Sequence, residues 1–162
     1  EQELSREECI WRKLRHRNVL PFLGVYEIGA PLPILLSPFS TFGHLGNYLR
    51  DHPSAPRQQL IHGVGFGLEY LHSKGIVHGD LKISNVLVNK KHVACICDFG
   101  ISRILQVAGF TTYNTGPGRY VAPELFAALD TDGTVIPAAP LTKSSDVYAF
   151  SCLVLDVRCE LL

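Results

Sequence analysis

Four polar residues in the middle of the chain have the types and the spacing needed to bind a cation and to accept a proton. Asp80, Lys82 and Asn85 lie within one short segment, and Asp98 follows after an apolar stretch. Amide and carboxylate oxygens are ligands that Mg²⁺ prefers, so Asn85 and Asp98 are candidate magnesium ligands. Asp80 could accept the proton of a hydroxyl group, and Lys82 could neutralise charge on a phosphoryl group in transit.

The elements around these residues are predicted from hydrophobic periodicity and turn residues. Two short strands, 86–88 and 93–97, lie between Asn85 and Asp98 and are joined by a polar turn. Before them we expect an amphipathic helix, two antiparallel strands around a Gly- and Pro-containing turn, a short polar helix and a longer buried helix. These elements are assigned to residues 3–16, 19–26, 34–39, 45–51 and 57–73, in that order. After them we expect a loop over 98–120, a surface insertion over 129–143 and an apolar helix from Asp146 onward.

The composition describes a globular chain of one domain. It has 162 residues, of which 46% are hydrophobic, so it can bury a core. Its 15 Lys and Arg balance its 15 Asp and Glu, which gives no electrostatic reason to expect a nucleic acid or an anionic membrane as partner. No apolar run approaches the roughly 20 residues that a membrane-spanning helix needs, so no membrane insertion is predicted.

The five cysteines are scattered through apolar stretches, which argues against a disulfide framework. We therefore expect a reducing compartment, the cytoplasm or the nucleus. Cys95 and Cys97 could form half of a metal site, but no second pair at ligand spacing accompanies them, and buried packing is the favoured interpretation. Methionine is absent, so the chain is expected to be part of a longer protein.

The order of the motifs resembles the protein kinase family, in particular the tyrosine-kinase-like serine/threonine kinases. The segment His78-Gly79-Asp80-Leu81-Lys82-Ile83-Ser84-Asn85 resembles the catalytic loop, and Asp98-Phe99-Gly100 resembles the metal-binding loop. Further along, Ala122-Pro123-Glu124 is similar to the end of the activation segment, and Ser145-Asp146-Val147-Tyr148-Ala149-Phe150 is similar to the central helix of the lower lobe. The resemblance covers essentially the whole chain.

The resemblance implies an α+β fold of two lobes, both of them partial in this chain. Residues 1–39 would be the remnant of the upper lobe, with the αC helix, two or three strands and the start of the hinge. Residues 40–162 would form the mainly helical lower lobe. ATP would bind between the two lobes.

The resemblance also implies roles for residues outside the catalytic loop. Glu7 would be the αC glutamate that helps to position ATP. Ser37 would be the gatekeeper of the adenine site, Leu87 would form its floor, and the hinge would contain Pro38, Phe39 and Ser40. His78 would pack in a hydrophobic spine with Trp11, Phe22 and Phe99 rather than act as a base.

The implied function is magnesium-dependent transfer of the γ-phosphoryl group of ATP to serine or threonine hydroxyls of a protein substrate. Asp80 would orient the hydroxyl, and Asn85 and Asp98 would bind Mg²⁺. The alternative is a catalytically impaired pseudokinase that serves as a protein-binding scaffold. It is kept open by Gly79 in place of the usual arginine, by Pro117 and by Ser151. The chain also lacks a Gly-rich loop and the strand lysine that would pair with Glu7, which truncation explains at least as well as degeneration. The fragment alone is therefore expected to be inactive.

Overall fold

The computed structural model describes residues 2–26, 34–99, 103–104, 118–126, 128–129, 135–136 and 139–159. The chain combines helices with two-stranded antiparallel sheets, in agreement with the predicted α+β class. The helices are α1 (Gln2–Trp11), α2 (Leu45–Asp51), α3 (Arg57–Ser73) and α4 (Lys143–Cys159), with three 3₁₀ turns at Ile83–Asn85, Gly118–Tyr120 and Pro123–Leu125. The strand pairs are β1 (Gly24–Tyr26) with β2 (Ile34–Leu36), β3 (Ile76–Val77) with β6 (Arg103–Ile104), β4 (Val86–Val88) with β5 (Ala94–Ile96), and β7 (Ala128–Leu129) with β8 (Val135–Ile136).

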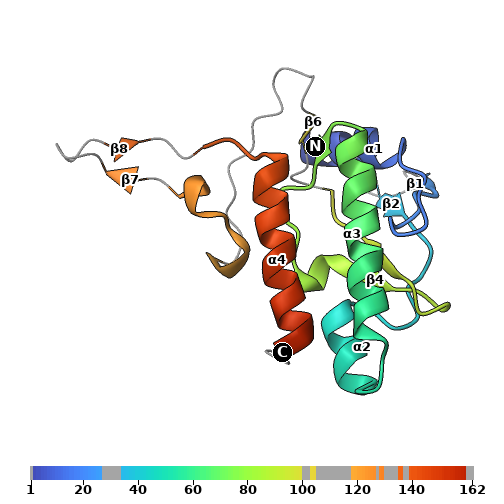
Figure 1. The fold of residues 1–162 in the computed structure, drawn as a ribbon. Coiled ribbons are helices and arrows are strands. Elements are labelled where there is room, and N and C mark those ends of the chain that lie inside the picture. The colour runs from blue at the N-terminus through green and yellow to red at the C-terminus, as the bar shows by residue number, and fades with distance from the viewer. Residues whose placement is uncertain are drawn as a thin grey trace.

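Helices α3 and α4 lie side by side and form the centre of the molecule (Figure 1). Helix α3 has the predicted bounds, because its apolar residues at spacings of three and four give it one buried face. Helix α4 begins before the predicted Asp146. Thr142 and Ser145 explain the earlier start, since the Thr142 Oγ1 accepts the N–H of Ser145 at 3.1 Å and the Ser145 Oγ accepts the N–H of Thr142 at 3.0 Å.

The β4–β5 hairpin packs against α3 and has the predicted position, with Val86 opposite Ile96 and Val88 opposite Ala94. Glycines of α3 make the close packing possible. A Cβ at Gly67 would lie 2.6 Å from the backbone oxygen of Asn18, and one at Gly63 would lie 2.7 Å from the Asn18 Nδ2. The chain after α1 can therefore lie directly on α3 and join the edge of β5.

Helix α1 ends at Trp11, so the prediction of a helix over 3–16 was wrong at its C-terminal end. Beyond Trp11 the chain tightens into turns, with the N–H of Leu14 donating to the Trp11 oxygen at 3.0 Å. The Arg15 guanidinium then donates to the Leu14 oxygen at 2.7 Å, and the Arg15 backbone N–H donates to the Tyr70 hydroxyl at 2.9 Å. A contact with α3 therefore replaces the next helical turn.

The strand predicted over 19–26 is also shorter than expected, because only residues 24–26 pair with β2. Val19 instead forms a parallel bridge to Ile96 of β5, and Leu20 donates its N–H to the Ile96 oxygen at 2.8 Å. Pro21 follows and has no N–H to continue the ladder. The second strand, predicted over 34–39, ends at Leu36 before Pro38.

The loop predicted over 98–120 contains β6 and the 3₁₀ turn at Gly118–Tyr120, and the predicted insertion over 129–143 contains β8. The β7–β8 pair lies apart from the helical body in Figure 1. The predicted turn over 29–33 lies outside the described residues, as do Gly100 and Pro117. Among the helices that the structure describes, none has the length and apolar character to cross a bilayer.

Candidate active site

Asp80 lies at the centre of a small hydrogen-bonded set in the loop between β3 and β4. Its Oδ2 accepts the Lys82 Nζ at 2.6 Å and the Asn85 Nδ2 at 2.9 Å. Asn85 also donates to the Asp80 backbone oxygen at 2.9 Å, which links the two ends of the segment 80–85. Both side-chain contacts reach Oδ2, so Oδ1 accepts no hydrogen bond from the described residues and is the oxygen that could take a proton. The three residues predicted for catalysis are therefore together.

Asn85 and Asp98 lie at the same end of the β4–β5 hairpin. Asn85 directly precedes β4, and its backbone oxygen accepts the N–H of Cys97 at 3.0 Å, one residue before Asp98. Asn85 is buried while Asp98 is exposed, and Asp98 has a φ of 66°, a left-handed conformation that is uncommon for residues other than glycine. The two predicted magnesium ligands thus come from neighbouring strand ends.

The donor set fits a magnesium ion that is shared with a nucleotide. The Asn85 amide uses its nitrogen on Asp80, so its oxygen is the atom that remains for a cation. No group of three or more His, Cys, Asp or Glu side chains that could hold a metal occurs among the described residues. Mg²⁺ bound together with a nucleotide takes only one or two oxygen ligands from the protein, because phosphate oxygens and water fill the rest of its octahedral coordination.

Asp146 at the start of α4 holds the backbone of the catalytic loop. Its Oδ2 accepts the His78 N–H at 2.8 Å, and its Oδ1 accepts the Gly79 N–H at 2.9 Å. The Nε2 of His72 on α3 also contacts Oδ2 at 2.8 Å, although Asp146 is only 1% exposed. Sequence reasoning missed this role. The signal was an acidic residue inside an apolar helix, because buried carboxylates are normally paired.

The predicted hydrophobic spine is confirmed as a row of rings. Trp11 contacts Phe22 with 5.4 Å between ring centroids and Phe99 with 6.0 Å, and Phe99 contacts His78 at 5.5 Å. The His78 Nε2 donates to the Cys97 oxygen at 3.0 Å, while its Nδ1 accepts the Asp80 N–H at 3.2 Å. Both ring nitrogens are thus used for structure, which agrees with a packed role for His78.

Glu7 on α1 contacts the metal-binding loop rather than the catalytic loop. Its Oε1 accepts the N–H of Phe99 at 3.3 Å, next to Asp98. Burial raises the pKa of the Glu7 carboxyl, the Phe99 N–H lowers it, and the nearby Asp98 charge raises it further. A half-buried carboxylate of this kind would be stabilised in its charged form by a cationic partner.

The residues predicted for the adenine site lie next to the β4–β5 hairpin. Leu87 is half-buried opposite Cys95, and a bridge joins it to His44, four residues after Ser40. Pro38, Phe39 and Ser40 line a hollow of about 520 Å³ together with Cys95 and the β4–β5 turn, and Leu87 is not part of its lining. Phe39 is 90% exposed. Ser37 is half-buried at the end of β2.

Two of the three departures from the kinase pattern are accommodated without disturbing the loop. Gly79 has a φ of 82°, which glycine adopts without strain, and its N–H is bonded to Asp146. Ser151 is exposed on α4, and its Oγ donates to the Val147 oxygen at 2.9 Å within the same helix. The third, Pro117, lies outside the described residues.

Comparison with known proteins agrees with this geometry. The family model described as "Protein tyrosine and serine/threonine kinase" matches residues 1–160. The chain therefore belongs to the protein kinase family. Its α+β arrangement of small sheets and helices is that of a partial two-lobe kinase fold, which confirms the fold and the family predicted from the motifs.

Several similar proteins are serine/threonine-protein kinases of Arabidopsis thaliana. STY17 is 31% identical over 96% of this chain and 26% of its own length. CTR1 is 34% identical over 96% of this chain and 19% of its own length, and STY46 is 29% identical over 97% of this chain. The chain thus spans about a quarter or less of the length of these relatives.

Proposed function

We propose that this chain carries the catalytic loop of a magnesium-dependent kinase that phosphorylates serine or threonine residues of protein substrates. The observation that carries the proposal is the Asp80 carboxylate, held on Oδ2 by Lys82 and Asn85 while Oδ1 accepts nothing from the described residues. An oriented carboxylate of this kind can take the proton of an incoming hydroxyl. Relatives named as serine/threonine-protein kinases support the same class of acceptor.

Each residue then has a separate task. Asp80 would orient the acceptor hydroxyl through Oδ1. Lys82, whose Nζ lies 2.6 Å from the Asp80 Oδ2, would place a positive charge beside the phosphoryl group in transit. Asn85 and Asp98 would hold the magnesium ion from the two strand ends, and a bound Mg²⁺ with ATP would supply the reactive γ-phosphoryl group and neutralise its charge. Glu7 would fix the segment that carries Asp98 through the Phe99 N–H. We also propose that the protein resides in a reducing compartment, the cytoplasm or the nucleus, because its five cysteines are scattered through apolar stretches.

The test separates the two carboxylates in the complete protein that contains this chain. Asp98→Asn should weaken magnesium-dependent ATP binding and turnover together, because a neutral amide is a poorer ligand for a hard cation. Asp80→Asn should leave ATP affinity nearly unchanged and slow the chemical step by about two to four orders of magnitude, which is typical of a lost general base. Asp51→Asn, at an exposed position of α2, is the matched control.

Two measurements give the answer: ATP titrations with and without Mg²⁺, and single-turnover phosphorylation of a generic serine/threonine substrate. If the wild type binds ATP equally with and without Mg²⁺ and neither substitution changes phosphoryl transfer, the catalytic assignment is wrong. The pseudokinase scaffold would then replace it.

A further inference from the structure

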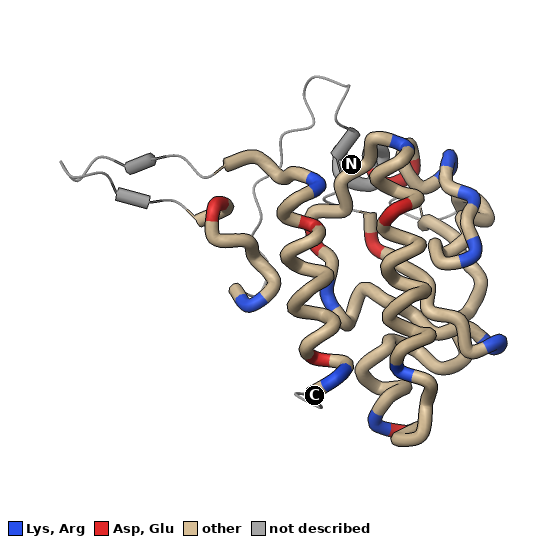
Figure 2. Tube along the Cα trace, viewed as in Figure 1, with Lys and Arg blue, Asp and Glu red and all other residues tan. Residues whose placement is uncertain are grey.

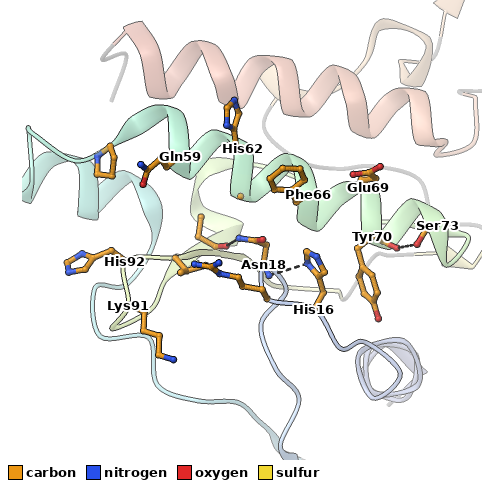
Figure 3. A pocket seen from close by; sticks show the side chains of 15 residues that line it. His16, Asn18, Gln59, His62, Phe66, Glu69, Tyr70, Ser73, Lys91 and His92 are labelled. Atoms are coloured by element: carbon orange, nitrogen blue, oxygen red, sulfur yellow. Dashed lines mark hydrogen bonds between the residues drawn. The ribbon is translucent and has the colours of Figure 1, made fainter.

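A long groove runs along the face of α3 that is turned toward the β4–β5 hairpin. It has a volume of about 770 Å³ and shares no residue with the catalytic loop or the metal-binding loop. Figure 3 shows α3 as one wall, with the β4–β5 turn and the segment after α1 facing it. Its lining extends along α3 from Gln59 to Ser73, about 21 Å at 1.5 Å per residue. That length suits about six residues of an extended peptide.

The floor of the groove is shaped by tight backbone packing. Gly63 has no side chain to fill the space above Asn18, whose Nδ2 donates to the Ala94 oxygen at 2.9 Å. The Asn18 backbone oxygen accepts the N–H of Ile96 at 2.9 Å. Both edges of β5 are thus already paired, on one side with β4 and on the other with residues 18–20. An occupant would therefore be held by side chains and not by adding a strand.

The wall opposite α3 is positively charged. Arg17 and Lys91 both line the groove and are exposed, and neither makes an ion pair with any described residue. Lys90 is exposed beside Lys91, and in Figure 2 the β4–β5 turn and the chain after α1 both carry basic residues. His92 lines the groove next to these cations. The acidic residue in the lining is Glu69, which belongs to α3 and not to this wall.

Other side chains of the groove offer apolar contact and directed hydrogen bonding. Phe66 is 58% exposed although it lies in the middle of α3. His16 stacks on Tyr70 with ring centroids 4.8 Å apart, and its Nδ1 accepts the Asn18 N–H at 3.2 Å. A neutral His16 ring therefore carries its hydrogen on Nε2, where it can donate to an oxygen of a ligand.

We propose that this groove binds an extended acidic segment of a partner protein. Carboxylates of the segment would pair with Arg17 and Lys91, and an apolar side chain would cover Phe66. Charge complementarity with exposed cations mainly accelerates association and selects the partner. Because the lining excludes the catalytic residues, a docked segment leaves Asp80 accessible to a substrate. A nucleic acid fits less well, since the chain has no net charge and the α3 wall is partly apolar. The proposal does not depend on catalytic activity.

The test measures fluorescence anisotropy of a labelled heptapeptide, Asp-Glu-Leu-Glu-Phe-Asp-Asp, with the complete protein. The same peptide with lysine at its five acidic positions is the second probe, and an oligouridylate of similar length is the third. We expect the acidic peptide to bind more tightly than both. Arg17→Glu combined with Lys91→Glu should weaken its binding at least tenfold, about 1.4 kcal/mol, and Phe66→Ala should weaken it severalfold.

The matched control is Lys13→Glu combined with Lys143→Glu, which changes the net charge equally at exposed positions outside the groove lining. This control should keep the wild-type affinity. No binding of the acidic peptide, equal binding of the lysine peptide, or equal weakening by the control pair would each overturn the proposal. Tighter binding of the oligouridylate that is lost in the Arg17 and Lys91 variant would assign the groove to nucleic acid instead.

Discussion

Asp146 and Gly79 are 67 positions apart in the sequence, yet the buried Asp146 Oδ1 accepts the Gly79 N–H at 2.9 Å. The second oxygen of the same carboxylate accepts the His78 N–H, so α4 fixes the backbone immediately before Asp80. An amide at position 146 has only one acceptor oxygen and would leave one of these N–H groups without a partner.

Asp146→Asn is therefore expected to lower the free energy of unfolding by about 2–4 kcal/mol, because a charge-assisted bond is lost and a buried donor is left unsatisfied. Turnover should also fall, since a displaced catalytic loop misplaces the base. Urea unfolding followed by circular dichroism measures the first effect. Asp51→Asn, at an exposed position, should change stability very little, and equal stability of the two variants would contradict the supporting role.

The cysteines should differ sharply in their reaction with iodoacetamide. Cys9 and Cys159 are exposed, whereas Cys95 is buried. Burial raises the pKa of the Cys97 thiol to about 12, and the Asp98 charge contributes in the same direction. Only about one Cys97 thiol in ten thousand would then be ionised at pH 8, and the thiolate is the reactive form.

Mass spectrometry after a short reaction at pH 8 should therefore find label on Cys9 and Cys159 and almost none on Cys95 or Cys97. Full labelling of all five cysteines in urea is the control for the chemistry. Labelling of folded Cys97 at the rate of Cys9 would show that the hairpin end is open to reagent.

The contact of Tyr120 with α4 should make stability depend on alkaline pH. The Tyr120 hydroxyl donates to the buried Asp156, which also pairs with Arg119 at 2.7 Å. Burial and the Asp156 carboxylate together raise the pKa of Tyr120 to about 12 from its ordinary 10.0. Since the folded state keeps the proton more tightly, its stabilisation is complete below pH 10 and is lost as the pH rises toward 12.

The difference in unfolding free energy between wild type and Tyr120→Phe should therefore be largest below pH 10. Toward pH 12 this difference should shrink by about 1 kcal/mol, which is less than the full pKa shift would give because the Tyr120 ring is partly exposed. Urea unfolding of both proteins over this pH range is the measurement. A difference that stays constant with pH would mean that Asp156 does not hold the Tyr120 proton.

Local sequence patterns predicted the elements that are defined by hydrophobic spacing and by turn residues within their own segment. Apolar residues at helical spacing gave α3 its bounds, and the polar turn between two β-prone runs located the β4–β5 hairpin. The family motifs predicted that Asp80, Lys82 and Asn85 belong to one catalytic site. In the structure Lys82 and Asn85 both donate hydrogen bonds to the Asp80 carboxylate.

Contacts between distant segments could not be predicted in the same way. After the end of α1, the Arg15 N–H donates a hydrogen bond to the Tyr70 hydroxyl, 55 positions away in the sequence. The hydrogen bond of Glu7 with the Phe99 N–H crosses 92 positions. No periodicity within a window of a dozen residues reports such contacts, so the helix end and the Glu7 partner became visible only in the folded chain.

The single tryptophan of the chain should report nucleotide binding. Trp11 is almost completely buried, and its Nε1 donates to the Leu20 oxygen at 2.5 Å. Its ring contacts Phe99, which directly follows the proposed magnesium ligand Asp98. Binding of Mg²⁺ and ATP at Asp98 should shift the Phe99 ring and thus change the emission of Trp11.

In the complete protein, any other tryptophan is first replaced by phenylalanine so that Trp11 alone gives the emission. With Mg²⁺ present, this emission should change with ATP concentration and reach saturation. The change should be much weaker with ATP and a chelator, and Asp98→Asn should require higher ATP for the same response. Phe99→Leu should reduce the amplitude but not the ATP affinity, because it removes the ring contact and keeps the ligand. Free N-acetyltryptophanamide corrects for absorption by ATP. A response that saturates equally without Mg²⁺, or equally in Asp98→Asn, would show that Asp98 does not couple the metal to Trp11.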